Sequence, residues 1–98
     1  MPLYEIVLKR GAIDDLDRLR KYDATQVADA MEKHLTHEPM KESRSRIKRL
    51  RGGKDPDYRL RVMDYRVFYS VREQERRVDV LRIMHKDEAQ EYYEELER

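Results

Sequence analysis

Basic residues concentrate in the middle of this chain, between Lys41 and Arg66. The stretch holds ten lysines and arginines against four acids, a net charge of +6, although the whole 98-residue chain carries only +1. A binding partner responds to this local field more than to the total charge. Guanidinium groups match phosphate oxygens and stack on bases, so arginines interleaved with tyrosines suit single-stranded RNA. We therefore interpret the stretch as a surface for phosphate.

Two arginines of this stretch share one face of a predicted strand. Residues 58–62 alternate strictly, with Arg59 and Arg61 on one side of the strand. The other side holds Tyr58, Leu60 and Val62. This alternation is the period of a half-buried strand. Arg66 follows after a tight connection at Met63-Asp64. A charged strand face often serves only to keep an edge soluble. That explanation is weaker here, because few acids lie nearby to balance the arginines.

Candidates for proton transfer follow near the end of the chain, at His85, Lys86 and Tyr92. An imidazole titrates near neutral pH, whereas a lysine or tyrosine acts as a base only if neighbours lower its pKa. We expect the arginines to lower the pKa of Tyr92, and we assign Tyr93 to packing. The sequence has no cysteine, and no metal-binding, phosphate-loop or serine-nucleophile motif stands out, so we expect no metal or other cofactor.

The elements that must position these residues fit one domain over residues 1–98. No stretch approaches a membrane span or a signal peptide, and we expect a cytoplasmic protein. Pro39 ends a helical hairpin, and the second helix has Asp23 or Thr25 as its cap. We predict a strand over 3–8, a helix from Ala12 through Leu19 with Tyr22 just beyond, a helix to about His37, a loop or very short strand over 41–57, strands over 58–62, 65–71 and 78–84, and a helix over 87–97.

The order of these motifs resembles the RelE/ParE superfamily of bacterial toxins. The resemblance spans nearly the whole chain and implies an α+β fold of the RelE-like microbial RNase type. In that fold an N-terminal strand and a helical hairpin pack on a small antiparallel sheet of about four strands, followed by a short C-terminal helix. The blocks that carry it are Leu50-Arg51-Gly52, Tyr58-Arg59-Leu60-Arg61-Val62, Asp64-Tyr65-Arg66-Val67-Phe68-Tyr69, and Val80 to Lys86.

RelE-like members of this superfamily cut mRNA in the ribosomal decoding site, whereas ParE-like members poison DNA gyrase and lack the catalytic set. The resemblance places that set at two basic residues of one strand, an arginine of the next, a basic residue after the last strand and a tyrosine of the C-terminal helix. Those positions hold Arg59, Arg61, Arg66, Lys86 and Tyr92 here. They favour a ribosome-dependent mRNA endonuclease, although arginine replaces the usual lysines of the strand pair and Lys86 replaces the common arginine.

The resemblance implies cleavage by attack of the substrate's own 2′-hydroxyl on the adjacent phosphate, without a metal. Arg61 and Arg66 would stabilise the transition state, and Arg59 would hold the phosphate or lower the pKa of the base. Arginine stays protonated and cannot be the base. Tyr92 is the first candidate for the base and Lys86 the next, and His85 is an alternative base at neutral pH or the acid for the leaving group, so the choice among the three stays open. RNA or ribosome docking is assigned to five further cations, Arg44, Arg46, Lys48, Arg49 and Arg51.

A cationic toxin needs masking, so the resemblance also implies a cognate acidic antitoxin in a toxin–antitoxin hetero-oligomer. The other expected partners are the ribosome and mRNA, and no membrane. Two alternatives remain open. One is a ParE-like inhibitor of DNA gyrase, and the other is a relic that binds RNA with a steep salt dependence but does not cut it.

Overall fold

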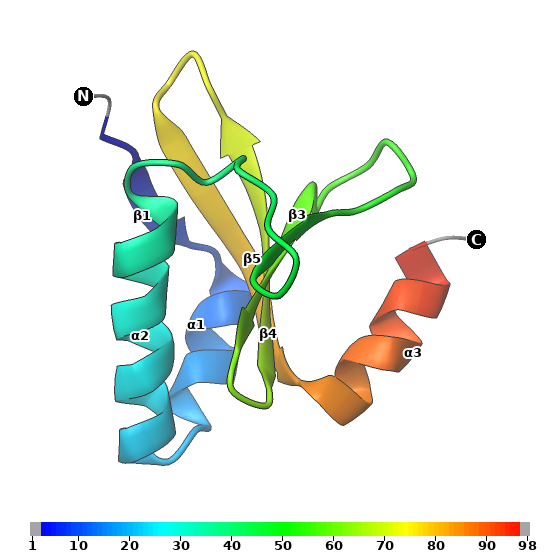
Figure 1. The fold of residues 1–98 in the computed structure, drawn as a ribbon. Coiled ribbons are helices and arrows are strands. Elements are labelled where there is room, and N and C mark those ends of the chain that lie inside the picture. The colour runs from blue at the N-terminus through cyan, green and yellow to red at the C-terminus, as the bar shows by residue number, and fades with distance from the viewer. Residues whose placement is uncertain (1–2, 97–98) are drawn as a thin grey trace.

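A five-stranded sheet separates two helices on one face from a third helix on the other (Figure 1). The computed structural model describes residues 3–96. The last residue of the predicted helix over 87–97, Glu97, lies outside the described residues. The elements are β1 (Glu5–Leu8), α1 (Arg10–Asp17), α2 (Lys21–Leu35), β2 (Ile47–Arg49), β3 (Tyr58–Val62), β4 (Tyr65–Arg72), β5 (Arg77–His85) and α3 (Lys86–Leu96).

The strands lie in the order β1-β5-β4-β3-β2. Antiparallel pairing of β3, β4 and β5 confirms the predicted meander, and β2 is the very short strand that was the alternative to a loop. The expectation of about four antiparallel strands was wrong in one respect, because β1 pairs parallel with β5 and the sheet is mixed. A parallel pair needs a crossover connection, which α1 and α2 begin here. The α+β class is confirmed.

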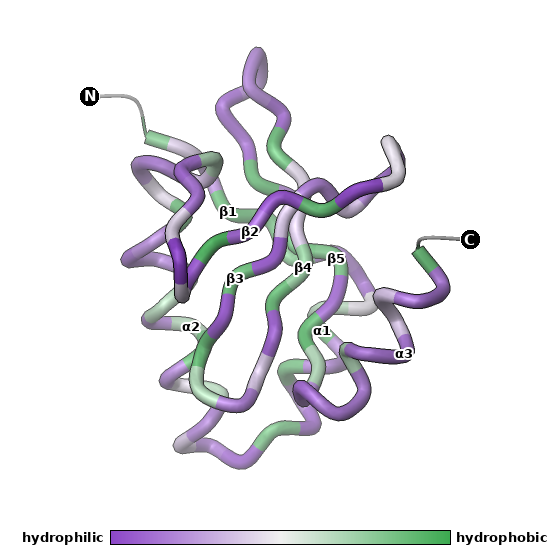
Figure 2. The backbone as a smooth tube through the Cα atoms, turned by 45° about the vertical axis from the view of Figure 1, so that its right-hand side comes forward, coloured by the Kyte–Doolittle hydropathy of each residue, from purple (hydrophilic) through white to green (hydrophobic). Residues whose placement is uncertain are grey.

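Hydrophobic packing forms two layers, one on each face of the sheet. The larger core lies between the sheet and the α1–α2 hairpin and includes Val27, Leu60 and Tyr69. The smaller core joins α3 to the sheet through Phe68, Met84 and Ala89. Hydrophobic and hydrophilic positions alternate along β3 (Figure 2), as the period-two pattern predicted. The outward residues of β3 therefore face α3.

The helical hairpin differs in detail from the prediction. The first helix begins two residues earlier and ends at Asp17, and the second begins at Lys21, ahead of both predicted caps. Tyr22 is 67% exposed and Ile13 is 43% exposed, so neither belongs to the core, whereas the adjacent Ala12 is buried. Among the described residues, no helix combines the length and the apolar character that crossing a membrane would require.

A buried carboxylate of α1, that of Asp15, joins this helix to β5. Asp15 is only 7% exposed, and its carboxylate accepts hydrogen bonds from the Ile83 backbone N–H at 2.8 Å and from Arg82 Nε at 2.7 Å. Because β1 ends opposite Val80, β5 has no strand partner on the β1 side beyond that point, although β4 still pairs with its other side. The carboxylate takes the place of the missing strand's carbonyl. A Cβ at Gly11 would lie 2.8 Å from Arg82 Cδ, so this close approach requires glycine.

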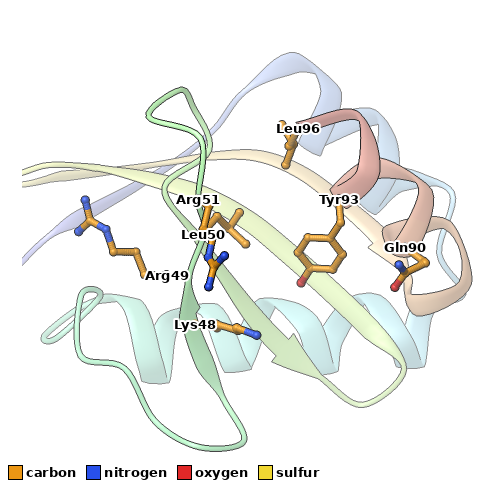
Figure 3. A pocket seen from close by; sticks show the side chains of 7 residues that line it. All are labelled: Lys48, Arg49, Leu50, Arg51, Gln90, Tyr93 and Leu96. Carbon is orange, nitrogen blue, oxygen red and sulfur yellow. The ribbon is translucent and has the colours of Figure 1, made fainter. Parts of the chain in front are cut away.

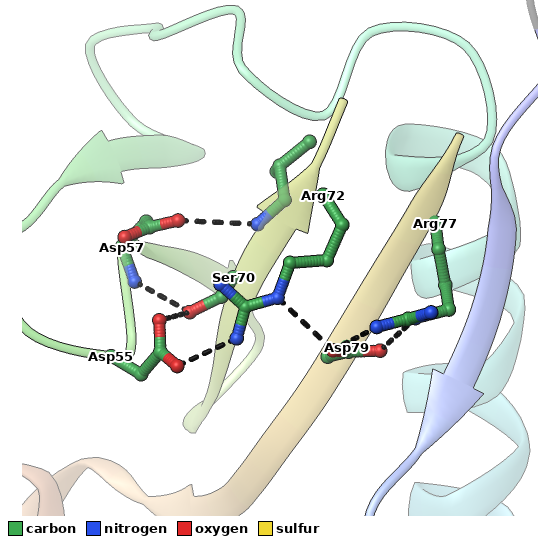
Figure 4. A network of polar contacts seen from close by, with 7 residues as sticks. Asp55, Asp57, Ser70, Arg72, Arg77 and Asp79 are labelled. Carbon is green, nitrogen blue, oxygen red and sulfur yellow. Dashed lines mark hydrogen bonds and ion pairs between the residues drawn. The ribbon is translucent and has the colours of Figure 1, made fainter. Parts of the chain in front are cut away.

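A second polar network fixes the loop between β2 and β3 (Figure 4). Arg72 donates to Asp55 at 2.6 Å and to Asp79 at 3.3 Å, and Arg77 donates to Asp79 at 2.7 Å. Ser70 Oγ also donates to Asp55, at 2.8 Å. The hydrogen bond from Arg77 holds the pKa of the buried Asp79 below its ordinary value, and the bond from Arg72 does the same for Asp55. This loop joins the edge strand β2 to β3. The network anchors the loop to β4 and β5.

Candidate functional site

Three arginines come together on the face of the sheet that α3 covers. The alternation of β3 turns Leu60 inward and leaves Arg59 and Arg61 on the outer face. In the register of β3 with β4, Arg61 lies directly opposite Arg66, and Arg59 lies opposite Phe68. The structure therefore brings together the three arginines that the sequence selected, which we name the arginine cluster (Arg59, Arg61 and Arg66).

The arginine cluster has no acidic partner among the described residues. None of its members lies within 4.0 Å of a described carboxylate in an ion pair. Arg66 is held instead by backbone carbonyls, with Nη1 donating to Tyr65 O at 2.8 Å and to Met63 O at 3.2 Å. Burial, together with the charges of Arg59 and Arg61, lowers the pKa of Arg66. Like charges placed opposite one another cost stability, so an anion bound between these guanidinium groups would relieve the repulsion.

Arg59 also has one donor atom without a described hydrogen-bond partner. Its Nε is buried, yet it has no hydrogen-bond partner among the described residues. Leaving a buried donor unsatisfied typically costs about 1–3 kcal/mol. Arg59 is therefore held in the arginine cluster at a cost in stability.

Tyr93, rather than Tyr92, faces the arginine cluster. Both tyrosines of α3 pack edge-on against Phe68, with centroid distances of 4.7 Å for Tyr92 and 5.4 Å for Tyr93. Burial raises the pKa of Tyr93, and the nearby guanidinium groups of Arg59 and Arg66 oppose that shift. Burial raises the pKa of Tyr92 as well, and the cation that opposes the shift there is Arg82. The expectation that the cluster lowers the pKa of Tyr92 was therefore wrong.

His85 and Lys86 lie at the end of β5, beside the β3–β4 turn. The His85 ring packs edge-on against Tyr65 at 5.8 Å, and the Tyr65 hydroxyl donates to Asp23 of α2 at 2.8 Å. His85 thus lies on the α2 face of the sheet, opposite the arginine cluster. Lys86 Nζ lies 3.7 Å from Asp64 Oδ1, so its charge is already partnered. Their assignment as proton-transfer groups stays a prediction that this geometry does not favour.

A cleft of about 370 Å³ opens between β2 and α3 (Figure 3). Lys48 and Arg51 extend on the Tyr93 side, whereas Arg49 points away from Tyr93. Arg49 instead donates to the Tyr58 hydroxyl at 3.1 Å, on the other face of the sheet. The residues that line the cleft are Lys48, Arg49, Leu50, Arg51, Gln90, Tyr93 and Leu96.

The five predicted docking residues therefore fall into different places. Lys48, Arg49 and Arg51 line the cleft beside α3, and Arg46 lines a second cleft on the α2 side. Arg44 is exposed and lines neither cleft. Within residues 3–96, no group of three or more histidine, aspartate or glutamate side chains is placed to hold a metal ion.

Sequence reasoning missed the residues that α3 contributes to this cleft. Gln90, Tyr93 and Leu96 are spaced three residues apart, so they share one face of a helix, and Tyr92 falls on a neighbouring face. That spacing was the available signal. It did not decide the matter alone, because the rotation of the helix against the sheet depends on where the helix begins.

The fold is similar to that of solved RelE toxins. A mutant of the free RelE toxin of Escherichia coli matches with a TM-score of 0.73 and 18% identity, covering 92% of this chain and 90% of that one. The RelBE2 toxin–antitoxin complex of Mycobacterium tuberculosis gives 0.70 and 24% identity, with 85% and 98% covered. An archaeal RelE–RelB complex of Pyrococcus horikoshii OT3 gives 0.64 and 27% identity, with 88% and 97% covered. The architecture is thus that of a RelE-like toxin.

Residues 6–90 match the family model of the ParE toxin of type II toxin-antitoxin system, parDE. This match covers most of the chain, and the chain belongs to this family of toxins, within the RelE/ParE superfamily. The resemblance drawn from the motif order is thereby confirmed. No curated protein matches the sequence significantly.

Proposed function

We propose that this type II toxin is an endoribonuclease that cuts mRNA on the ribosome. The observation that carries the proposal is the arginine cluster, with its members side by side, unpartnered by any described acid and facing Tyr93. A phosphodiester supplies the negative charge and the acceptor oxygens that this arrangement lacks. Preorganised donors of this kind stabilise the charge that develops on a phosphorane as it forms.

In the proposed reaction the 2′-oxygen of one nucleotide attacks the adjacent phosphorus, and the bond from phosphorus to the 5′-oxygen breaks. The products are a 2′,3′-cyclic phosphate and a 5′-hydroxyl end. Arg61 and Arg66 bind the non-bridging oxygens, and Arg59 adds positive charge beside them. Burial raises the pKa of Tyr93, so its phenol is protonated at neutral pH and donates its proton to the leaving 5′-oxygen. It regains a proton from solvent.

The attacking 2′-hydroxyl loses its proton to solvent water in this scheme. The three candidate bases, Tyr92, Lys86 and His85, stay predictions, since none of them adjoins the arginine cluster in the described geometry. A reaction without a strong internal base depends on accurate alignment of the 2′-oxygen with the scissile bond, which is worth several kcal/mol of the barrier. This dependence supports a reaction in which the ribosome positions the mRNA.

We propose a cognate antitoxin as the second partner of this chain. The similar RelE chains of M. tuberculosis and P. horikoshii were solved as complexes with antitoxins. The unpartnered cations of this chain favour an acidic antitoxin, in a toxin–antitoxin hetero-oligomer that masks the arginine cluster. In the absence of the antitoxin the same surface is open to nucleic acid.

The direct test uses purified chain and ribosomes programmed with a defined mRNA. Discrete cuts should appear with the wild-type chain and fall by about 10²–10³-fold in Arg61→Ala and Arg66→Ala, the usual loss for one preorganised donor. Arg10→Ala, an exposed position on α1, should cut at the wild-type rate. Undiminished cutting by both cluster variants would sink the proposal, as would ribosome binding by the wild type without any cut.

Inhibition of DNA gyrase is the second candidate function, because the matching family model is that of the ParE toxin. The arrangement of residues that would contact gyrase is not defined by the arginine cluster. The two functions separate in one comparison, with the same protein added to a gyrase supercoiling assay and to programmed ribosomes. Loss of supercoiling without mRNA cuts would favour gyrase.

A further inference from the structure

A second basic cleft lies on the opposite side of β2 from the arginine cluster. It measures about 540 Å³ and opens between the end of α2 and the segment that leads into β2. Lys33, Lys41 and Arg46 contribute permanent positive charges, and His34 and His37 also line the cleft. The one acid in its lining, Glu38, pairs with Lys41 at 3.8 Å. The cleft therefore keeps a net positive charge.

The helix dipole explains only part of this charge. The last turn of α2 contains Lys33 and His34, and cations commonly complement the carbonyl end of a helix. Arg46 lies beyond that helix, yet its charge adds to theirs. Burial and the charges of Arg46 and Lys33 lower the pKa of His34. Cations from two separate segments thus converge on one histidine, which favours an anion between them.

The segment that holds Arg46 is rigidly formed. Ser43 N donates to Ile47 O at 2.9 Å, and Ser43 Oγ accepts from the backbone N–H groups of Arg46 and Ile47 at 3.1 and 3.2 Å. The Ser43 hydroxyl hydrogen is then left to bind another acceptor. In addition, Arg46 O accepts from the Arg61 N–H at 2.8 Å. This segment is therefore joined directly to the strand that carries the arginine cluster, and its cations need little reorganisation to bind a ligand.

The outer edge of β2 is closed against strand addition. The Ile47 carbonyl is taken by Ser43, and the Arg49 N–H donates to Glu42 Oε1 at 3.1 Å. An acidic peptide could not extend the sheet here by backbone pairing. What remains available are point contacts from ammonium, guanidinium, imidazole and hydroxyl groups, and these suit phosphate oxygens.

We propose that this second cleft binds a phosphate group of a polynucleotide backbone. Because β2 is the edge strand, a single strand of RNA that crosses it would place phosphates on both faces of the sheet. One phosphate would lie at the arginine cluster and another at Lys33 and Arg46. The proposal concerns binding alone, and it does not require that the chain cuts RNA or that a ribosome is present.

Nuclear magnetic resonance of the His34 ring reports directly on the cleft. A bound phosphate offsets the charges of Arg46 and Lys33 and therefore raises the pKa of His34. We expect a saturating ten-nucleotide oligouridylate to shift the His34 ring signals and to raise the pKa of His34, in the wild-type chain and by the same amount at saturation in Arg61→Gln. Persistence in Arg61→Gln separates this proposal from the proposed cleavage.

A pair of variants tests the cations themselves. Lys33→Gln/Arg46→Gln should abolish the His34 response and reduce the slope of log Kd against log salt by about 0.7, the value for one lost phosphate contact on a single strand. Lys21→Gln/Arg10→Gln removes the same charge from exposed positions elsewhere and should leave the His34 response intact. All four side chains are exposed, and thermal denaturation checks that both variants fold.

Three outcomes would overturn the proposal. In the first, neither the oligouridylate nor millimolar inorganic phosphate changes the His34 signals. In the second, inorganic phosphate shifts His34 at millimolar concentration but the oligouridylate does not, which would assign the cleft to a free anion. In the third, a polyglutamate of equal charge shifts His34 as strongly as the oligouridylate, which would assign the cleft to an acidic protein.

Discussion

Neutralising Arg61 should make the protein more stable while removing its activity. Arg61 lies directly opposite Arg66 in the β3–β4 register, and neither has a described acidic partner. Coulomb's law gives about 1 kcal/mol for two unit charges about 4 Å apart in water, and less as they separate. This value lies within the range of about 0.2–1 kcal/mol for cross-strand pairs. Arg61→Gln should therefore raise the free energy of unfolding by about 0.5 kcal/mol and Tm by about 2–4 °C.

Arg61 is the better position for this test than Arg66. Arg61 is exposed, whereas Arg66 donates to two backbone carbonyls, and Arg66→Gln would lose those bonds as well. Urea denaturation at 20 mM and 1 M salt measures the effect, which should vanish at 1 M because the Debye length falls to about 3 Å. Lys54→Gln, at an exposed loop position, is the matched control and should change stability little at either salt. A loss of stability in Arg61→Gln, or a gain that persists at 1 M salt, would refute the reasoning.

Three further predictions follow from particular contacts. Tyr93→Phe should slow cleavage by at least tenfold, and Tyr92→Phe should change it less than threefold; equal effects in the ribosome assay would contradict the assignment to Tyr93. The pKa of Asp79 is lower in the folded state than its ordinary value of 3.8. The ionised Asp79 therefore contributes fully to stability when the pH is above that ordinary pKa, and this contribution is lost as the pH falls through the lower pKa of the folded state. Asp79→Asn should therefore cost about 3 kcal/mol at pH 7 and flatten the loss of stability below pH 4 in acid titrations followed by circular dichroism. Gly11→Ala should lower the free energy of unfolding by about 1–3 kcal/mol, measured in urea, because the new Cβ would lie 2.8 Å from Arg82 Cδ. In a helix without such a contact, the same change usually raises stability by about 1 kcal/mol.

The strand that carries the arginines could be predicted from the sequence because its information is local. In β3 every second side chain turns inward, and a strand has only two faces, so placing one residue places all the others. Arg59 and Arg61 could then be assigned to one face without knowing the fold. The cross-strand partner Arg66 followed because the connection at Met63 and Asp64 is short.

Features that depend on contacts distant in the chain could not be predicted in this way. On α3 each residue turns the direction of the side chain by about 100°, so an uncertainty of one residue in the helix start exchanges Tyr92 for Tyr93. The structure starts α3 at Lys86, one residue before the predicted start. The pairing of Asp15 with Arg82 joins residues 67 positions apart, and the parallel pairing of β1 with β5 likewise depends on the whole crossover.

The distribution of acids among the arginines distinguishes structural arginines from those available for function. Arg82 is neutralised by Asp15, and Arg72 and Arg77 share Asp79, so these guanidinium groups hold elements together. A chain with nearly as many acids as bases could have placed a carboxylate beside Arg61 or Arg66 at little cost. Among the described residues no carboxylate pairs with either arginine, and the two cations lie opposite each other at a cost in stability. Such a cost persists where the unfavourable arrangement serves binding, and for paired guanidinium groups the ligand that removes the repulsion is an anion.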